Sequence, residues 1–245
     1  MNNARQQAAE ALAQRAAAGN PLRLWLRDDD AVAPSAPLDR LLDLTGAAGV
    51  PLTLAVIPAP WNAAPTGPDL ARRLDAAPWV SVAVHGWSHH NHAPAGVKKQ
   101  ELGPHRPVAV MRAELQAGWA RIAGLHGARA LPMLVPPWNR IAPDLVPLLA
   151  VDGFRAISTF GPEVQVAGMQ VLNTHLDIID WHGGRVGRPA EAMWADLAAL
   201  ARSGRRQAGI LTHHLVHDAQ SWDFLADLFV FAPQYGAQWQ AAAAL

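Results

Sequence analysis

Residues 22–30 read LRLWLRDDD, a short run rich in leucine and tryptophan that ends in three adjacent aspartates. A short apolar run bounded by polar residues is typical of a buried strand. The chain contains several more runs of this kind, and we expect strands at 22–27, 52–57, 79–84, 131–135, 154–158, 171–178 and 208–212.

The segments between most of these runs are rich in Ala and Leu at helical spacing, with Pro or Asp near several starts and Gly near several ends. We expect helices at 37–48, 108–126, 143–151 and 189–201. Strands alternating with helices predict a parallel sheet, and about seven such units favour a closed or nearly closed (β/α) barrel within the α/β class. An open, doubly wound sheet is the alternative, although the nucleotide-binding motif G-x-G-x-x-G is absent.

We expect residues 1–245 to form one domain, because no linker or break in composition is visible. An N-terminal helix would occupy residues 1–20, the barrel residues 22–218, and a C-terminal helical segment residues 219–245.

The composition excludes several kinds of function. Lys plus Arg and Asp plus Glu number 20 each, so no basic surplus indicates a nucleic-acid partner. Cysteine is absent, which excludes thiolate metal sites and a cysteine nucleophile. No apolar stretch is long enough to span a membrane and no targeting signal is visible, so we expect a cytoplasmic protein.

Polar residues gather directly after five of the expected strands. In (β/α) barrels the carboxyl ends of the strands share one rim, and catalytic residues lie there. The segments on this rim would be DDD at 28–30, HGWSHHNH at 85–92, PPWNR at 136–140, DIIDWH at 177–182 and HHLVHD at 213–218. We therefore expect the functional site at this rim.

The aspartates at 28–30 and the histidines after 84 suit a metal site. Three adjacent carboxylates repel one another, and a bound dication would remove this cost; a solvated turn or a helix N-cap is the alternative. Adjacent aspartates in an extended chain point to opposite sides, so one can bind metal while its neighbour acts as a base. His85 and His89 are four residues apart, which lets both imidazoles bind one ion on a helical turn, and His90 and His92 are alternative ligands or substrate contacts. Two histidines and one aspartate suit zinc or a similar dication and leave a position for water.

Asp177 and His213 are candidates for an oriented acid, in which the carboxylate holds the imidazole and favours its charged form. His214 and His217 are alternatives to His213 for this role.

Three tryptophans, Trp87, Trp138 and Trp181, lie in the same segments. Tryptophan is usually a core residue, but an indole at the rim of a site is a common platform for a sugar or an acyl group. The motifs of serine hydrolases, HExxH zinc proteases and P-loop enzymes are absent.

In this order the segments resemble the five motifs of the polysaccharide deacetylase family, metal-dependent deacetylases of chitin, peptidoglycan and related sugars. The motifs are two adjacent aspartates, His-x-x-x-His, Arg-Pro-Pro-aromatic-Gly, Asp-x-x-Asp-Trp and Leu-x-His. The corresponding residues here are Asp29-Asp30, 85–89, 135–139, 177–181 and 211–213. Gly86 stands where the family usually has Ser or Thr, and Val135 stands in place of the arginine, whose role could fall to Arg27 or Arg140.

The resemblance implies a distorted (β/α) barrel and a role for each matched residue. Asp29 would be the general base, and a single divalent ion, expected to be zinc, would be held by Asp30, His85 and His89. His213, oriented by Asp177, would protonate the leaving amine. The residues implied in substrate binding are Trp87, Pro137, Trp138, Asn139 and Trp181. The alternative register makes Asp28 the base and Asp29 the ligand.

The resemblance also implies a hydrolase that removes an N-acyl group, expected to be acetyl, from an amino sugar or a sugar-containing substrate. The substrate would be a small molecule or an oligosaccharide. Three alternatives are a metal-dependent hydrolase of a small non-sugar amide or imide, a carbohydrate-binding relative without turnover, and a structural β/α domain whose histidine cluster binds metal only adventitiously.

Overall fold

Strand β1 (Arg23–Ala31) runs through both of the units into which the internal contacts divide the chain. The computed structural model describes residues 3–244. The first unit comprises Met1–Asp28, Ser35–Leu52 and Thr174–Leu245, and the second comprises Asp29–Pro34 and Thr53–Asn173.

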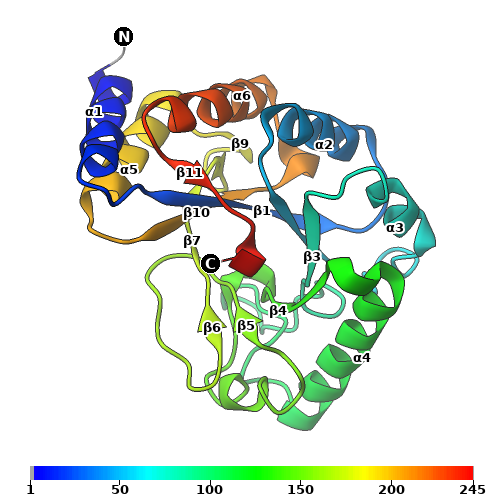
Figure 1. Ribbon diagram of the computed structural model, residues 1–245. Helices are drawn as coiled ribbons and strands as arrows, with labels where there is room; N and C mark the ends of the chain where they lie inside the picture. Colours follow the sequence, from blue (N-terminus) through cyan, green and yellow to red (C-terminus); the bar gives the residue numbers. More distant parts are fainter. Residues whose placement is uncertain (1–2, 245) are drawn as a thin grey trace. The chain divides into compact units, whose positions relative to one another are not determined.

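The first unit is a parallel sheet with helices (Figure 1). Its further strands are β7 (Thr174–Asp177), β10 (Gln207–Thr212), β11 (Gln238–Trp239) and the antiparallel pair β8 (Ile179–Asp180) and β9 (Val186–Gly187). Its helices are α1 (Asn3–Ala17), α2 (Ala36–Ala48), α5 (Ala190–Arg202) and α6 (Ala219–Gln234). The register of β1 with β10 pairs Asp28 with Thr212, so β10 ends opposite Asp28, three residues before the end of β1 at Ala31.

The second unit contains strands β2 (Leu52–Val56), β3 (Val80–Val84), β4 (Ala130–Leu134), β5 (Ala156–Ile157) and β6 (Gln170–Val171). Its helices are α3 (Pro68–Leu74) and α4 (Val108–His126). The end of β1 also lies in this unit, where the Ile57 N–H donates to the Ala31 carbonyl at 3.0 Å. Strands β3 and β4 are parallel, and their register pairs Val84 with Leu134, which aligns the ends of these two strands.

Along the sheet the strands follow the order β6-β5-β4-β3-β2-β1-β10-β7. The predicted α/β class is confirmed: the sheet is mostly parallel and is consistent with a distorted (β/α) barrel. The organisation of residues 1–245 as one domain stays a prediction.

Local chemistry explains where helix α2 begins and ends. The Ser35 side chain accepts a hydrogen bond from the Leu38 N–H, and Pro37 stands in the first turn, where a missing N–H has no cost. Gly49 ends the helix with a φ of 65°, a conformation that glycine adopts without steric cost. The prediction of a helix at 37–48 is correct to within one residue.

The single strand predicted at 171–178 is wrong, because this segment forms two strands, β6 and β7, with different partners. Between them, the Asn173 amide group accepts hydrogen bonds from the Thr159 N–H at 2.8 Å and hydroxyl at 3.0 Å, and donates to the carbonyls of Gly161 and Pro162. These bonds hold the chain in an irregular conformation between the two strands.

The helix predicted at 143–151 is also wrong, since only a 3-10 turn forms over Val146–Leu148. Pro147 has no N–H, and its ring clashes with the preceding turn of an α-helix. In the C-terminal segment, helix α6 ends at Gln234, after which β11 pairs with β1. Helix α3 and the β8–β9 pair were not among the elements predicted from the sequence.

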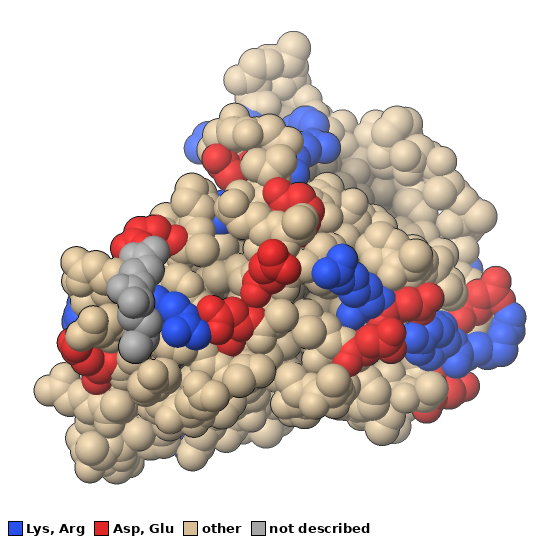
Figure 2. Space-filling view, turned by 90° about the horizontal axis from the view of Figure 1, so that it is seen from above, with Lys and Arg blue, Asp and Glu red and all other residues tan. Residues whose placement is uncertain are grey.

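Charged side chains of both signs lie next to one another on the face shown in Figure 2. In the first unit, Arg5 forms an ion pair with Asp227 at 2.6 Å. Among residues 3–244, no helix is both long enough and apolar enough to cross a membrane. The cytoplasmic location stays a prediction.

His126, the last residue of α4, predicts a dependence of stability on pH. The side chain is buried, and burial together with Arg129 lowers its pKa from 6.5 to about 4, against a smaller opposing effect of Asp75. Because the unfolded chain takes up this proton more readily, the free energy of unfolding should fall as the pH decreases from about 6.5 towards 4. His126→Leu should reduce this fall in urea unfolding at pH 7 and pH 5.

The exposed His105 provides the matched control, because His105→Leu should leave the pH dependence as it is in the wild type. An equal loss of stability in the wild type and in His126→Leu would show that folding does not lower the pKa of His126.

Candidate metal centre

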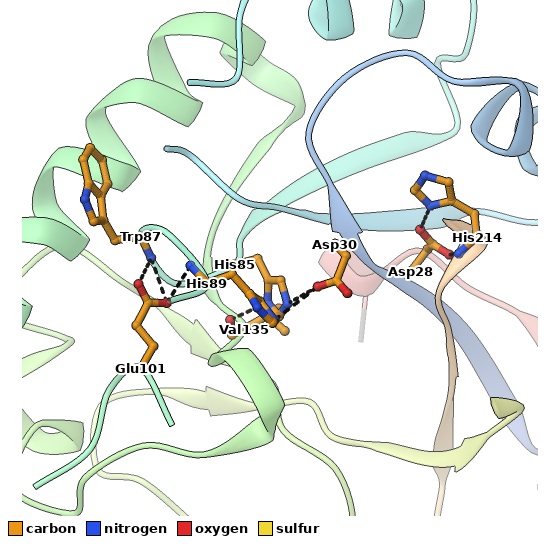
Figure 3. A network of polar contacts seen from close by, with 8 residues as sticks. All are labelled: Asp28, Asp30, His85, Trp87, His89, Glu101, Val135 and His214. Carbon is orange, nitrogen blue, oxygen red and sulfur yellow. Dashed lines mark hydrogen bonds and ion pairs between the residues drawn. The ribbon is translucent and has the colours of Figure 1, made fainter. Parts of the chain in front are cut away.

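Three side chains of the second unit direct one ligand atom each to a common point: Asp30, His85 and His89 (Figure 3). The Asp30 Oδ1 atom lies 3.1 Å from His85 Nε2 and 3.3 Å from His89 Nε2. All three ligand atoms lie within 4.8 Å of one another. His85 is buried, whereas Asp30 and His89 are partly exposed, so the cluster can be reached from solvent.

The strands place these residues. Asp30 lies in the last part of β1, and His85 directly follows β3. The His85 N–H donates to the carbonyl of Val56, the last residue of β2, at 2.8 Å, so the backbone of His85 is fixed against this strand. Asp30 and His89 adopt positive φ angles of 72° and 54°, which are uncommon for residues other than glycine. Such conformations cost about 1–3 kcal/mol each and are concentrated at functional sites.

A backbone carbonyl orients the His85 ring. Val135 directly follows β4, and its carbonyl oxygen lies 2.9 Å from His85 Nδ1. The carbonyl can only accept, so Nδ1 carries the proton and Nε2 is the nitrogen directed to Asp30. This arrangement, in which a ligand histidine donates its other N–H to a carbonyl, is common in protein metal sites.

Glu101, which was not among the predicted site residues, organises the loop that carries both histidines. Its carboxylate is fully buried and accepts hydrogen bonds from the backbone N–H groups of Trp87, Ser88 and His89, and from the Ser88 hydroxyl. The bond from the Ser88 N–H is the shortest, at 2.7 Å. The only signal in the sequence is that Glu101 lies between the histidine segment at 85–92 and the expected helix at 108–126, in residues for which neither a helix nor a strand is predicted.

Gly86 makes this arrangement possible. Its φ is 61°, and a Cβ at this position would overlap Glu101 Oε2 and the Pro137 ring. A glycine, where the resembling motif usually has Ser or Thr, therefore has a local steric reason.

The surroundings of the two histidines raise the pKa of His85 and lower the pKa of His89. Burial lowers the pKa of His85, but the carboxylates of Asp29 and Asp30 and the bond to Val135 outweigh it, and the pKa is raised. Burial and the neighbouring His85 lower the pKa of His89 to about 4, despite the attraction of Asp30. His89 is therefore neutral at pH 7, as a metal ligand must be.

The three aspartates differ in their surroundings. Asp28, in the first unit, is fully buried and accepts the His214 N–H at 2.8 Å and a second hydrogen bond from His214 Nδ1 (Figure 3). Asp29, in the second unit, is 2% exposed and is close enough to raise the pKa of His85. Both carboxylate oxygens of Asp28 are thus bonded to His214, which favours the register with Asp29 as base and Asp30 as ligand.

Within the first unit, Trp181 lies between the two residues of the predicted acid pair. Its indole N–H donates to Asp177 Oδ2 at 2.8 Å, and its ring packs edge-on against His213 with centroids 4.6 Å apart. Asp177 Oδ1 accepts the Ile179 N–H at 2.9 Å. The direct orientation of His213 by Asp177 stays a prediction.

The predicted substrate-binding residues of the second unit lie in different places. The Trp138 ring lies 4.2 Å from the His89 ring, centroid to centroid, and Trp138 and Asn139 have positive φ angles of 55° and 57°. Pro137 is buried against Gly86, and the Trp87 indole points away from the Asp30 carboxylate (Figure 3). Trp138 is therefore the indole that borders the histidine pair.

The two candidate replacements for the missing arginine differ in burial. Arg140 donates to the Lys99 carbonyl at 2.9 Å, and this contact is exposed. Arg27 is fully buried in β1, two residues before Asp29.

No family model matches the sequence, and no curated protein is significantly similar to it. Solved structures do share the fold. A peptidoglycan deacetylase from Bacillus subtilis is 17% identical with a TM-score of 0.59, covering 91% of this chain and 89% of that chain.

Two further structures come from carbohydrate esterase family 4. An acetyl xylan esterase from Clostridium thermocellum, in complex with a cobalt ion, is 17% identical with a TM-score of 0.56, covering 91% of this chain and 89% of that chain. An esterase from Streptomyces lividans, in complex with acetate, is 19% identical with a TM-score of 0.57, covering 88% and 90%. At these identities the similarity shows a shared fold.

Proposed function

We propose that this protein is a metal-dependent hydrolase that removes an acetyl group from an amino sugar or a sugar-containing substrate. The observation that carries the proposal is the convergence of Asp30, His85 and His89 on one point, in a chain whose fold is that of carbohydrate deacetylases and esterases. One carboxylate and two imidazoles are a typical ligand set of a catalytic zinc site, in which a further position takes water or substrate.

The spacing of the ligand atoms fits zinc. Tetrahedral ligands at about 2.1 Å from zinc lie about 3.4 Å from one another. The Asp30 Oδ1 atom lies 3.1 and 3.3 Å from the two Nε2 atoms, close to this value. We propose zinc as the natural ion on the basis of this donor set; cobalt is bound in the Clostridium thermocellum esterase.

The surrounding residues would divide the chemistry of amide hydrolysis. The bound dication would lower the pKa of a water towards about 7 and polarise the acyl carbonyl. Asp29 would accept the proton of the attacking water, and His213, with Asp177 as its predicted partner, would protonate the leaving amine. Trp138, Asn139, Pro137, Trp87 and Trp181 remain the proposed substrate contacts, with Trp138 best placed in the second unit because its ring contacts His89.

Metal analysis and acetate release test the proposal together. The purified protein should contain about one divalent ion per chain, and chelation should abolish acetate release from N-acetylglucosamine oligomers until zinc or cobalt is restored. His85→Ala should lose the metal, whereas His105→Ala, which changes an exposed histidine of the same unit, should retain it.

Other outcomes would identify the alternatives. Metal and sugar binding without acetate release would indicate a carbohydrate-binding protein. Metal-dependent hydrolysis of cyclic imides or small amides, with no action on acetylated sugars, would indicate the non-sugar hydrolase. Equal metal content in the wild type and in His85→Ala would exclude this metal centre.

A further inference from the structure

Asp28 and His214 form a buried pair within the first unit (Figure 3). The Asp28 carboxylate accepts hydrogen bonds from the backbone N–H of His214 at 2.8 Å and from its ring nitrogen Nδ1. The two side chains are 0% and 1% exposed. Burying a carboxylate with an imidazole adds little stability compared with apolar side chains of the same size, so the effect of this pair lies in the geometry that it imposes.

The pair fixes the peptide group that follows His213. Strand β10 ends at Thr212, and His213 is the next residue, with an extended backbone. The His214 N–H belongs to the planar peptide group between His213 and His214, so its bond to Asp28 sets the orientation of that plane. The second bond, from the ring, keeps the His214 side chain on the carboxylate.

Further hydrogen bonds close the turn that follows β10. The Val216 N–H donates to the His213 carbonyl at 3.0 Å. The Thr212 hydroxyl and His217 Nε2 are hydrogen-bonded to each other across the turn. The turn is therefore closed by its own bonds, and Asp28 ties it to the neighbouring strand β1.

We propose that the Asp28–His214 pair positions His213 for proton transfer to the leaving amine. The inference rests on the proposed function and deepens it, because it assigns Asp28 and His214 as positioning residues rather than as acid or base. His214 is enclosed with its Nδ1 on Asp28, whereas His213 is 9% exposed and packs against Trp181, which is 37% exposed. His213 is therefore the more accessible of the two histidines.

The contribution of the pair depends on the leaving group. The His213 imidazolium would pass a proton to the amine nitrogen as the C–N bond breaks, which gives a neutral amine and acetate. Without the bonds to Asp28, φ and ψ of His213 can change and its ring moves with them; a displacement of about 1 Å costs about 10²-fold in rate. In contrast, 4-nitrophenolate is a stable anion that leaves an acetate ester without a proton.

The test compares acetate release from N-acetylglucosamine oligomers with hydrolysis of 4-nitrophenyl acetate. His214→Ala should lower kcat for the oligomers about 10²-fold with KM changed less than about twofold, and should lower kcat for the ester less than about threefold. His214→Asn, whose side-chain amide nitrogen takes the place of Nδ1, should restore most of the activity on the oligomers. The control Leu215→Ala, which truncates an exposed side chain of the same turn, should change neither reaction.

A double variant separates positioning from direct catalysis. In a His213→Ala background, His214→Ala should lower kcat no further, because a positioning residue acts only through its partner. Circular dichroism melting verifies folding. If His214→Ala does not fold, His214→Gln replaces it, since the longer side chain places its amide nitrogen near the position of Nε2 rather than Nδ1.

Three outcomes overturn the inference while the proposed function stands. The first is an equal loss on both substrates in His214→Ala, and the second is no loss on either. The third is full activity of His213→Ala on the oligomers together with its loss in His214→Ala, which would make His214 the acid itself.

If the wild type hydrolyses neither substrate, the proposed function is wrong and crystal structures decide the inference. A His213 ring that moves by about 1 Å in His214→Ala and returns to its place in His214→Asn supports positioning by the pair. The same ring position in the wild type and in both variants overturns it.

Discussion

Asp29→Asn should lower kcat for acetate release about 10³-fold while the protein keeps its metal, because a general base contributes roughly 10²–10⁴-fold to such reactions. Asp29 is buried beside the metal-site histidines and does not belong to the ligand cluster. Asparagine has nearly the same shape as aspartate but cannot accept the proton of water at neutral pH. The measurements are steady-state kinetics and metal content of the same preparation.

Asp30→Asn is the matched comparison, since it changes the neighbouring carboxylate in the same way. This variant should lose the metal, because Asp30 Oδ1 is the atom that both imidazoles face. If Asp28→Asn instead abolishes turnover with the metal retained, and Asp29→Asn loses the metal, the alternative register is correct.

Glu101→Gln should weaken metal binding about 10–100-fold, the usual effect of removing a residue that orients metal ligands. One carboxylate oxygen would become an NH₂ group that faces backbone N–H groups of Trp87, Ser88 or His89, so at least one buried donor would lose its acceptor. Each such loss costs about 1–3 kcal/mol, and the free energy of unfolding should fall by a similar amount. Zinc titration and urea unfolding measure the two effects.

The partly buried Glu163 offers a control, because it lies outside the histidine loop. Glu163→Gln should change metal affinity less than twofold, whereas Glu101→Gln should weaken it by at least about 10-fold. Gly86→Ala should act in the same direction as Glu101→Gln, since its Cβ would overlap the Glu101 carboxylate and its φ is 61°. Unchanged metal affinity in both Glu101→Gln and Gly86→Ala would show that the loop holds its shape without Glu101.

Much of the fold follows from patterns within short stretches of sequence. The run at 22–27 followed by aspartates, and the runs that end before His85 and Val135, predicted parallel strands with polar ends, and the α/β class is confirmed. The wrong strand prediction at 171–178 occurs where hydrogen bonds to a distant segment override the local pattern. Residues 171–178 continue as a strand by composition, yet Asn173 bonds to residues 159–162 and divides them.

Some features of the candidate site could likewise be predicted from the sequence, and others could not. Aspartates at the end of one strand and histidines four apart after another are visible in the sequence, because parallel strands place their carboxyl ends at one edge. Asp30, rather than Asp28, faces His85, and it does so with a positive φ that the strand-like pattern of residues 22–30 does not indicate. The engagement of Asp28 by His214 joins residues 186 positions apart.

The sequence by itself determined the class of fold, the carboxylate and imidazole ligand types and the order in which they occur along the chain, because these depend on residue type and short-range periodicity. Only the tertiary structure decided which aspartate meets the histidines, that Glu101 holds their loop, and that Asp28 holds His214. The physical reason is that these contacts depend on backbone angles and hydrogen bonds between distant segments, and such contacts leave no periodic signal in the residues that form them.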